Sequence, residues 1–509
     1  MCNYLFAALI AASLTLVACG GAAAPNANEF VPSGTASPSA GPEKVAAPVS
    51  GSPIYHVIVV IQENRTFDNL FASSALNGGA GYPGANTPAG LTFTVAGTTS
   101  PLAEVPFEEP FDPDHSHDSL LSEWETQVGN PATTAADENV GFYEDTLHPV
   151  APEPSPPAGA VFAYVPDFET LLYHELAYTY ALADNMFSSR LVPTFPGHMF
   201  LISGQSELAA DDPLEAGQTS TINGTSPSIW GCDSPAGTFV PLFTGSNTDQ
   251  SQQPTSGTGT FPCFNQTTIG DLMDRKGVSW KYYTGALTDT VDASFDVYDA
   301  IQHIRDGTDW NADISTPETN IITDIQNCNL PNVSYVTPPG LDSDHAGDLS
   351  AGGPGWVGTI YLAIAESENN GNPACQYYGN TAMIVTWDDS GGWYDHVFPP
   401  TAPAGGYSWG LRVPLIVASA WASHGSSGGL PFVSHVQRDF GSILKYIESN
   451  WNLGTLGEDD ANADNLSDMF NYTQTPVPPI SATKMRQWIQ ATHFNLQAAK
   501  LDRTPYDDQ

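Results

Sequence analysis

Two adjacent carboxylates, Asp388 and Asp389, follow a short apolar run at 382–386. Two like charges repel each other at the end of a strand unless protons or a cation compensate for them. A divalent cation bound by carboxylate oxygens is the simplest compensation. The two glycines that follow allow a sharp turn, which would bring His396 back toward the same place. The alternative interpretation is an acidic turn on the surface.

A second polar segment also follows an apolar run. Residues 54–61 are β-branched and nearly continuous, as in a strand buried on both faces of a sheet, and Glu63 and Asn64 come directly after them. Ligands of open α/β sheets bind at the carboxyl ends of strands, so these two side chains are candidate oxygen ligands of a cation. The alternative is a polar turn in which Asn64 or Asp68 caps a helix.

Thr194 lies between two prolines, which predicts a stiff and extended segment. A hydroxyl held beside a divalent cation can lose its proton near neutral pH and act as a nucleophile. Histidines in carboxylate-rich loops are suited to protonate a leaving oxygen or to bind a phosphoryl group. Taken singly, each is equally explained as a loop or structural histidine. These histidines are His115, His117, His345 and His396.

The elements that must position these residues alternate between strands and helices. Further strands are predicted at 382–386 and 413–417, and helices near 168–182, 268–276 and 435–451. The last helix is predicted from apolar residues that recur on one face, namely Val436, Phe440, Ile443, Leu444 and Ile447. This order predicts an α/β fold with a mostly parallel central sheet and helices on both faces. Turn-rich stretches around 75–160 and 208–262 are interpreted as insertions.

The composition limits the classes of function. The chain has 509 residues, of which 41% are hydrophobic, so it can bury a large core. Only 14 Lys and Arg stand against 56 Asp and Glu, and the resulting net charge of -42 would repel a phosphate backbone. We therefore expect no nucleic-acid partner. Work at low pH would explain the scarcity of bases, and so would an ordinary compositional bias of the lineage.

The amino terminus predicts export. Residues 4–18 form an apolar run that is short for a membrane span and suits a signal peptide, although no Lys or Arg precedes it. The run ends before Cys19 in a sequence that resembles a bacterial lipobox, which predicts a lipid anchor on Cys19 in the cell envelope as the only membrane contact. A plain secretory signal is the alternative. We expect residues 1–18 to be the signal, 19–51 a flexible tether and 52–509 one domain.

Four cysteines remain in the predicted mature body, and they allow three disulfide connectivities. We favour the pairs that are adjacent in sequence, Cys232–Cys263 and Cys328–Cys375. None of the four stands in the spacing of a cysteine-based zinc site.

Together these segments resemble a bacterial phosphoesterase family that contains acid phosphatases and non-haemolytic phospholipases C. The resemblance runs from about residue 54 to 451. The motifs that carry it are ENRTFDNLF at 63–71, VPTFPGH at 192–198, SWKYY at 279–283, LPNVSYVTPP at 330–339, SDHAGD at 343–348, TWDDSGGWYDHV at 386–397, LRVPLIVASAWA at 411–422 and SHVQRDFGSILKYIE at 434–448.

The resemblance implies a fold similar to alkaline phosphatase and a role for each candidate residue. It makes Thr194 the nucleophile and a metal ligand, beside the further ligands Glu63, Asn64, Asp388 and Asp389. The cofactor would be one or two divalent cations, with Mg²⁺, Ca²⁺ or Mn²⁺ favoured by an all-oxygen ligand set and Zn²⁺ also allowed. Histidines would bind phosphate or transfer protons, namely His115, His345, His117 and His396.

One departure concerns the segment after the nucleophile. The family usually has Pro-Asn-Arg there, and this chain has Pro196-Gly197-His198. His198 would replace an arginine that can bind a phosphate through two nitrogens, and Asn64 would also contact the substrate. The expected activity is hydrolysis of phosphate monoesters through a phosphothreonine. A phospholipase C-type phosphodiesterase and a non-catalytic binding lipoprotein are the alternatives, and the oligomeric state stays open.

Overall fold

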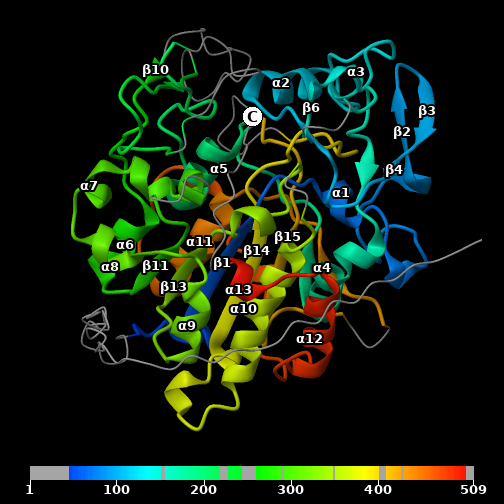
Figure 1. Ribbon diagram of the computed structural model, residues 1–509. Coiled ribbons are helices and arrows are strands. Elements are labelled where there is room, and N and C mark those ends of the chain that lie inside the picture. The colour runs from blue at the N-terminus through cyan, green and yellow to red at the C-terminus, as the bar shows by residue number, and fades with distance from the viewer. Residues whose placement is uncertain are drawn as a thin grey trace, which may run out of the picture. The chain divides into compact units, whose positions relative to one another are not determined.

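A central mixed sheet organises the molecule (Figure 1). Among the described residues it has eight strands in the spatial order β12-β11-β13-β1-β14-β15-β8-β16. Neighbours pair in parallel except at the β14–β15 and β15–β8 borders, which are antiparallel. In chain order these strands are β1 (His56–Gln62), β8 (Ala181–Ala183), β11 (Trp280–Tyr283), β12 (Ile314–Ser315), β13 (Val333–Val336), β14 (Thr381–Trp387), β15 (Leu415–Ser419) and β16 (Phe432–Ser434).

The computed structural model describes residues 45–150, 155–217, 227, 229–243, 259–287, 292–347, 350–400, 408–425 and 429–499. Within these ranges, four two-stranded sheets lie outside the central sheet. They pair β2 (Thr92–Val95) with β3 (Thr98–Pro101), β4 (Ala103–Glu104) with β7 (Ala163–Tyr164), β5 (Phe111–Pro113) with β6 (Leu147–Pro149), and β9 (Val240–Pro241) with β10 (Gly259–Thr260). Most of these strands fall in the ranges predicted as insertions.

Helices cover both faces of the sheet. Helices α4, α10 and α12 pack together on the face toward the viewer in Figure 1, and α11, which packs against α5, lies on the other. The helices are α1 (Phe67–Phe71), α2 (His117–Thr126), α3 (Val140–Glu144), α4 (Asp167–Thr179), α5 (Thr194–Ser203), α6 (Ile269–Lys276), α7 (Gln302–Arg305), α8 (Asp309–Asp313), α9 (Asn320–Gln326), α10 (Gly353–Ser367), α11 (Gly441–Trp451), α12 (Ala482–Ala491) and α13 (Leu496–Ala499). The predicted α/β class with a mostly parallel sheet is confirmed.

Burial explains why β1 and β14 form the centre. All seven residues of each strand are buried, and β1 lies between β13 and β14 with parallel partners on both sides. A strand covered on both faces needs apolar side chains in both directions, which a continuous β-branched run provides. Their parallel register pairs Gln62 with Trp387, so the residues that follow each strand emerge at one edge of the sheet.

Two predicted helices were wrong in their bounds. The helix predicted from 435 begins at Gly441, and Val436 lies outside it with 40% of its surface exposed. Residues 435–438 instead run beside the segment after β8, where the Arg438 N–H donates to the carbonyl of Asn185. The helix predicted to 182 ends at Thr179, because Ala181–Ala183 is the short strand β8. Both helices were predicted too long, because the hydrophobic pattern continues into the neighbouring strand or loop.

Both predicted disulfides, Cys232–Cys263 and Cys328–Cys375, are present. The described end of the predicted tether is bound to the body, since the Ala46 N–H donates to Asn332 Oδ1 at 2.7 Å and the Val49 N–H to the Asn450 carbonyl at 2.8 Å. The predicted signal peptide and Cys19 lie outside the described residues. In the described part of the chain, no helix has the length and apolar character needed to cross a membrane.

Candidate active site

The candidate active site lies where β1 and β14 end. Their parallel pairing continues one residue beyond the strands, since the Asp388 N–H donates to the Gln62 carbonyl at 3.0 Å. The Asn64 N–H then donates to Asp388 Oδ1 at 3.2 Å. Glu63, Asn64 and Asp388 are fully buried, and Asp389 is 1% exposed. The structure therefore brings together Glu63, Asn64 and Asp388, which the sequence assigned to two separate segments.

A tight turn between the two segments sets this geometry. Asn64 has φ 55° and Gly391 has φ 58°, both in the left-handed region. A Cβ on Gly391 would lie 2.4 Å from the Asn64 carbonyl oxygen, so a larger residue there would force the segments apart. The Gly391 N–H also donates to Asp389 Oδ1 at 2.6 Å. Only glycine allows the chain to turn and also to approach Asn64 this closely.

Thr194 is the first residue of α5, and not part of an extended segment as the flanking prolines predicted. Pro193 is the extended residue and precedes the helix as its cap. The Thr194 hydroxyl donates to Glu63 Oε2 at 3.4 Å and lies 3.5 Å from Asn64 Oδ1. The positive end of the helix dipole favours a developing negative charge on this oxygen. A proline before the first helical residue is compatible with the helix because no backbone N–H is lost inside it.

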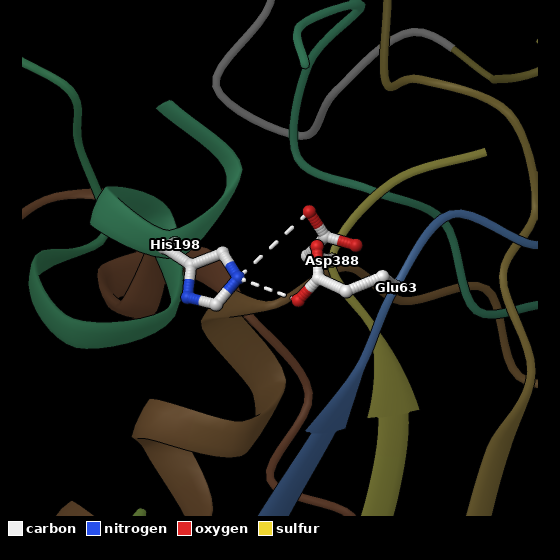
Figure 2. Close-up of side chains that lie close together, drawn as sticks. All are labelled: Glu63, His198 and Asp388. Atoms are coloured by element: carbon white, nitrogen blue, oxygen red, sulfur yellow. Dashed lines mark hydrogen bonds and ion pairs between the residues drawn. The ribbon is translucent and has the colours of Figure 1, made fainter. Parts of the chain in front are cut away.

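One helical turn later, His198 faces two of the carboxylates (Figure 2). Its Nε2 lies 3.1 Å from Glu63 Oε1 and 3.8 Å from Asp388 Oδ2. These three side chains each offer one ligand atom, and the atoms lie within 4.8 Å of one another. Oδ2 of Asp388 is buried and receives no hydrogen bond from the described residues. Such an acceptor is costly to bury without compensation, so the donor set fits a divalent cation.

His115 and His345 form a pair beside this group, with ring centroids 5.6 Å apart. Nδ1 of His115 lies 2.9 Å from the Pro113 carbonyl, and its Nε2 lies 2.9 Å from Asn64 Nδ2. A carbonyl only accepts, so Nδ1 carries the hydrogen and Nε2 accepts from the Asn64 amide. This bond also turns the Asn64 Oδ1 toward Thr194. Nδ1 of His345 bonds the Ala346 carbonyl at 2.6 Å in the same way.

The two remaining predicted histidines, His117 and His396, contact other residues in the described part of the chain. Nδ1 of His117 lies 2.6 Å from the Leu191 carbonyl, and its ring packs edge-on against Phe243. His117 therefore holds the segment that leads to Thr194. His396 lies 2.7 Å from Asp68 through Nδ1 and 3.1 Å from Asn86 through Nε2. Its contacts among the described residues place it in a different ionic cluster.

That cluster is centred on Arg412, which the sequence analysis did not single out. Its guanidinium is fully buried and binds Asp395 at 2.8 Å and Asp68 at 2.9 Å. Burial alone would lower the pKa of His396, but the Asp68 carboxylate outweighs it and the net shift is upward. We refer to Asp68, Asp395, His396 and Arg412 as the Arg412 cluster. It joins the segment after Asn64 to the segment after Asp389.

Arg65 provides a second anchor that sequence reasoning missed. It is fully buried, pairs with Glu109 at 2.6 Å, and donates through Nε to the Asp344 carbonyl at 2.6 Å. Its guanidinium also stacks over Phe107 and Trp393. Burial raises the pKa of Glu109 to about 7 even though Arg65 opposes the shift. The signal in the sequence is an arginine directly after the predicted buried strand, since a buried arginine needs acidic partners.

Comparisons with known proteins identify the family of this chain. The profile of the Phosphoesterase family matches residues 54–454. Phospholipase C B of Mycobacterium tuberculosis is 24% identical over 476 residues, covering 84% of this chain and 79% of that protein. Non-specific phospholipase C6 of Arabidopsis thaliana is 23% identical over 497 residues, covering 88% and 80%. A solved structure of a protein in the alkaline phosphatase superfamily from Vibrio parahaemolyticus covers 66% of this chain and 82% of its own, at 10% identity and TM-score 0.28.

Proposed function

The chain belongs to the Phosphoesterase family and is a phosphoric ester hydrolase, and we propose that it cleaves phosphodiesters of the phospholipid class with Thr194 as its nucleophile. The observation that carries the proposal is the position of the Thr194 hydroxyl. It lies 3.4 Å from a Glu63 oxygen and 3.5 Å from an Asn64 oxygen, at the start of a helix and inside a buried group of carboxylates.

The residues support attack by Thr194 on phosphorus. Glu63, Asn64, Asp388 and Asp389 would hold a divalent cation, which when bound lowers the pKa of the Thr194 hydroxyl and counters charge on the phosphoryl oxygens. The Thr194 oxygen forms a bond to phosphorus while the bond to the leaving oxygen breaks. The leaving oxygen departs as an alcohol, and the phosphorus bound to Thr194 keeps the second ester group, so water later releases a phosphate monoester.

His115 and His345 would move protons in both halves of this reaction. Nδ1 of each ring donates to a backbone carbonyl, so Nε2 of the neutral ring is a base. Nε2 would take the Thr194 proton and pass it to the leaving oxygen, and at His115 the Asn64 amide must first turn away from Nε2. In the second half the same nitrogen takes a proton from water, which attacks phosphorus and breaks its bond to Thr194. The hydrogen bonds from Nδ1 to the carbonyls fix the orientation of each ring, so its Nε2 points the same way in both halves of the reaction.

Charge favours a diester over a monoester. A monoester phosphate carries up to two negative charges near neutral pH, and a diester carries one. The buried arginines close in sequence to the site are bound to acids, since Arg65 pairs with Glu109 and Arg412 with Asp68 and Asp395. His198 stands where the family usually has arginine. With less positive charge to offer, this site suits the less charged substrate, and the named relatives are phospholipases C.

Monoester hydrolysis is the second candidate, and the motifs shared with acid phosphatases favour it. A direct comparison decides between the two: hydrolysis of phosphatidylcholine in mixed micelles against hydrolysis of p-nitrophenyl phosphate, with metal-loaded protein. We expect a higher kcat/KM on the phospholipid. A preference for the monoester would overturn the diester proposal and leave the phosphoesterase assignment intact.

Substitution of Thr194 tests the nucleophile. Thr194→Ala should lower kcat by roughly 10³-fold or more, because no oxygen remains to form the covalent intermediate. Thr194→Ser should keep part of the activity, since it retains a hydroxyl. Thr359→Ala is a matched control, because the Thr359 hydroxyl bonds the Gly355 carbonyl inside α10. Normal turnover by Thr194→Ala would dismiss the nucleophile.

A further inference from the structure

The hydrogen bonds of Tyr282 determine which nitrogen of His198 carries a hydrogen. A tyrosine hydroxyl has one proton, and Tyr282 donates it to the Phe295 carbonyl at 2.8 Å. Toward His198, whose Nδ1 lies 3.3 Å away, the Tyr282 oxygen must therefore accept. Nδ1 of His198 carries a hydrogen, and the neutral ring then presents a lone pair at Nε2.

That lone pair faces oxygen atoms that can only accept. Nε2 lies 3.1 Å from Glu63 Oε1 and 3.8 Å from Asp388 Oδ2, as the dashed lines in Figure 2 show. Either a second proton on the ring or a cation must lie between them. One imidazolium supplies a single positive charge for Glu63, Asp388 and the adjacent Asp389, all of them buried. A divalent cation supplies two charges and coordinates the oxygens as well as the nitrogen.

We propose that His198 is a direct ligand of the catalytic cation, which it would bind through Nε2 together with Glu63 and Asp388. The inference rests on the proposed function, because it concerns the same cation. His198 and Thr194 stand four residues apart in α5, so their side chains lie on one face of the helix. One helix therefore presents both the nucleophile and a ligand to the cation.

A nitrogen ligand changes the class of metal. Imidazole suits Zn²⁺, Fe²⁺ and similar ions, whereas carboxylate and carbonyl oxygens suit Mg²⁺ and Ca²⁺. The all-oxygen set favoured by the sequence pointed to Mg²⁺, Ca²⁺ or Mn²⁺. With His198 in the set, Zn²⁺ should bind more tightly than Mg²⁺ or Ca²⁺. Tyr282 would then be a positioning residue, since it fixes the ring that binds the metal.

Calorimetric titration of metal-free protein with Zn²⁺ and, separately, Mg²⁺ tests the assignment. His198→Gln should weaken Zn²⁺ binding by about 100-fold or more and Mg²⁺ binding by less than about fivefold, since Gln replaces the nitrogen with an oxygen ligand. Tyr282→Phe should weaken Zn²⁺ binding by about tenfold. His303→Gln is the matched control, because His303 lies at the surface against Asn265 and Asp271. It should bind Zn²⁺ as the unmodified protein does.

A spectroscopic measurement gives a readout that activity cannot. Pulsed electron paramagnetic resonance of Cu²⁺-loaded protein detects the remote nitrogen of a bound imidazole, and His198→Gln should lose that signal. Unchanged Zn²⁺ affinity in His198→Gln would overturn the assignment, as would two ring N–H signals for His198 in the nitrogen NMR spectrum of Zn²⁺-loaded protein. These results leave the phosphoesterase proposal standing. Full hydrolysis by metal-free protein would instead defeat the cation and His198 together.

Discussion

Replacing Arg412 with lysine should destabilise the protein by about 3–4 kcal/mol. The guanidinium is fully buried and all of its N–H groups face acceptors. Nε and Nη2 bind Asp395 and Asp68 at 2.8–3.1 Å, and Nη1 donates to the carbonyls of Asp184 and Asn86 at 2.8 and 3.1 Å. A lysine brings the same charge but only three donors from one point, so it leaves buried acceptors unpaired. Each buried acceptor that loses its hydrogen bond costs about 1–3 kcal/mol, so two unpaired acceptors account for the expected loss.

The measurement is the free energy of unfolding from urea titration, followed by fluorescence in parallel for both proteins. Arg486→Lys is the matched control, because Arg486 pairs with Glu366 while 57% of its side chain stays exposed. Exposed pairs contribute at most about 1 kcal/mol, so the control should change little. If Arg412→Lys lost less than about 1 kcal/mol, the Arg412 cluster would not stabilise the fold as argued.

The same variant should also weaken the metal site without touching it. The Arg412 cluster joins Asp68, four residues after Asn64, to Asp395, six residues after Asp389. If this link positions the ligands, Zn²⁺ affinity in native Arg412→Lys should fall by roughly tenfold. Equal affinity in the folded variant would make the cluster a stabilising element only.

Three further outcomes are expected. Gly391→Ala should lower the free energy of unfolding by about 2 kcal/mol and should also weaken metal binding, since its Cβ would lie 2.4 Å from the Asn64 carbonyl oxygen. Thermal unfolding measures the first effect and calorimetric metal titration the second. Burial and the neighbouring Asp460 raise the pKa of Glu448 to about 8 in the folded protein. The stability that protonated Glu448 contributes is fully present below the ordinary pKa of a glutamate and is lost as the pH rises toward 8. Glu448→Gln, which stays neutral, should therefore raise stability at pH 8 by about 2 kcal/mol and leave it unchanged near pH 4, as unfolding titrations at both pH values would show. Chelation of the metal should abolish hydrolysis and lower the unfolding temperature, and added Zn²⁺ should restore both.

Strand order explains why the sequence could predict part of the site. Glu63 and Asp388 follow two apolar runs that are long enough and β-branched enough to be buried strands. Parallel strands in one sheet deliver their following residues to one edge, so the pattern of apolar runs is enough to predict that the two segments converge. The disulfide pairs were chosen as the pairs adjacent in sequence, although four cysteines alone allow three connectivities.

The direction of individual side chains could not be predicted in this way. Thr194 opens a helix although prolines flank it, because a proline is tolerated immediately before or within the first helical turn. His396 belongs to the same motif as Asp388 and yet binds Asp68. The backbone turns at Asn64 and Gly391, where φ is positive. The spacing of residues in the sequence does not predict this turn.

Buried acids serve as ligands or as anchors, and spacing alone does not separate the two. The motif at 386–397 contains both: Asp388 faces His198, whereas Asp395 binds the guanidinium of Arg412. What distinguishes them is the cationic partner, because a buried carboxylate needs a base, a proton or a metal. Only 14 Lys and Arg are available to 56 acids, so arginines cannot neutralise every buried group. A divalent cation should therefore bind where several buried acids surround a histidine and no arginine neutralises them.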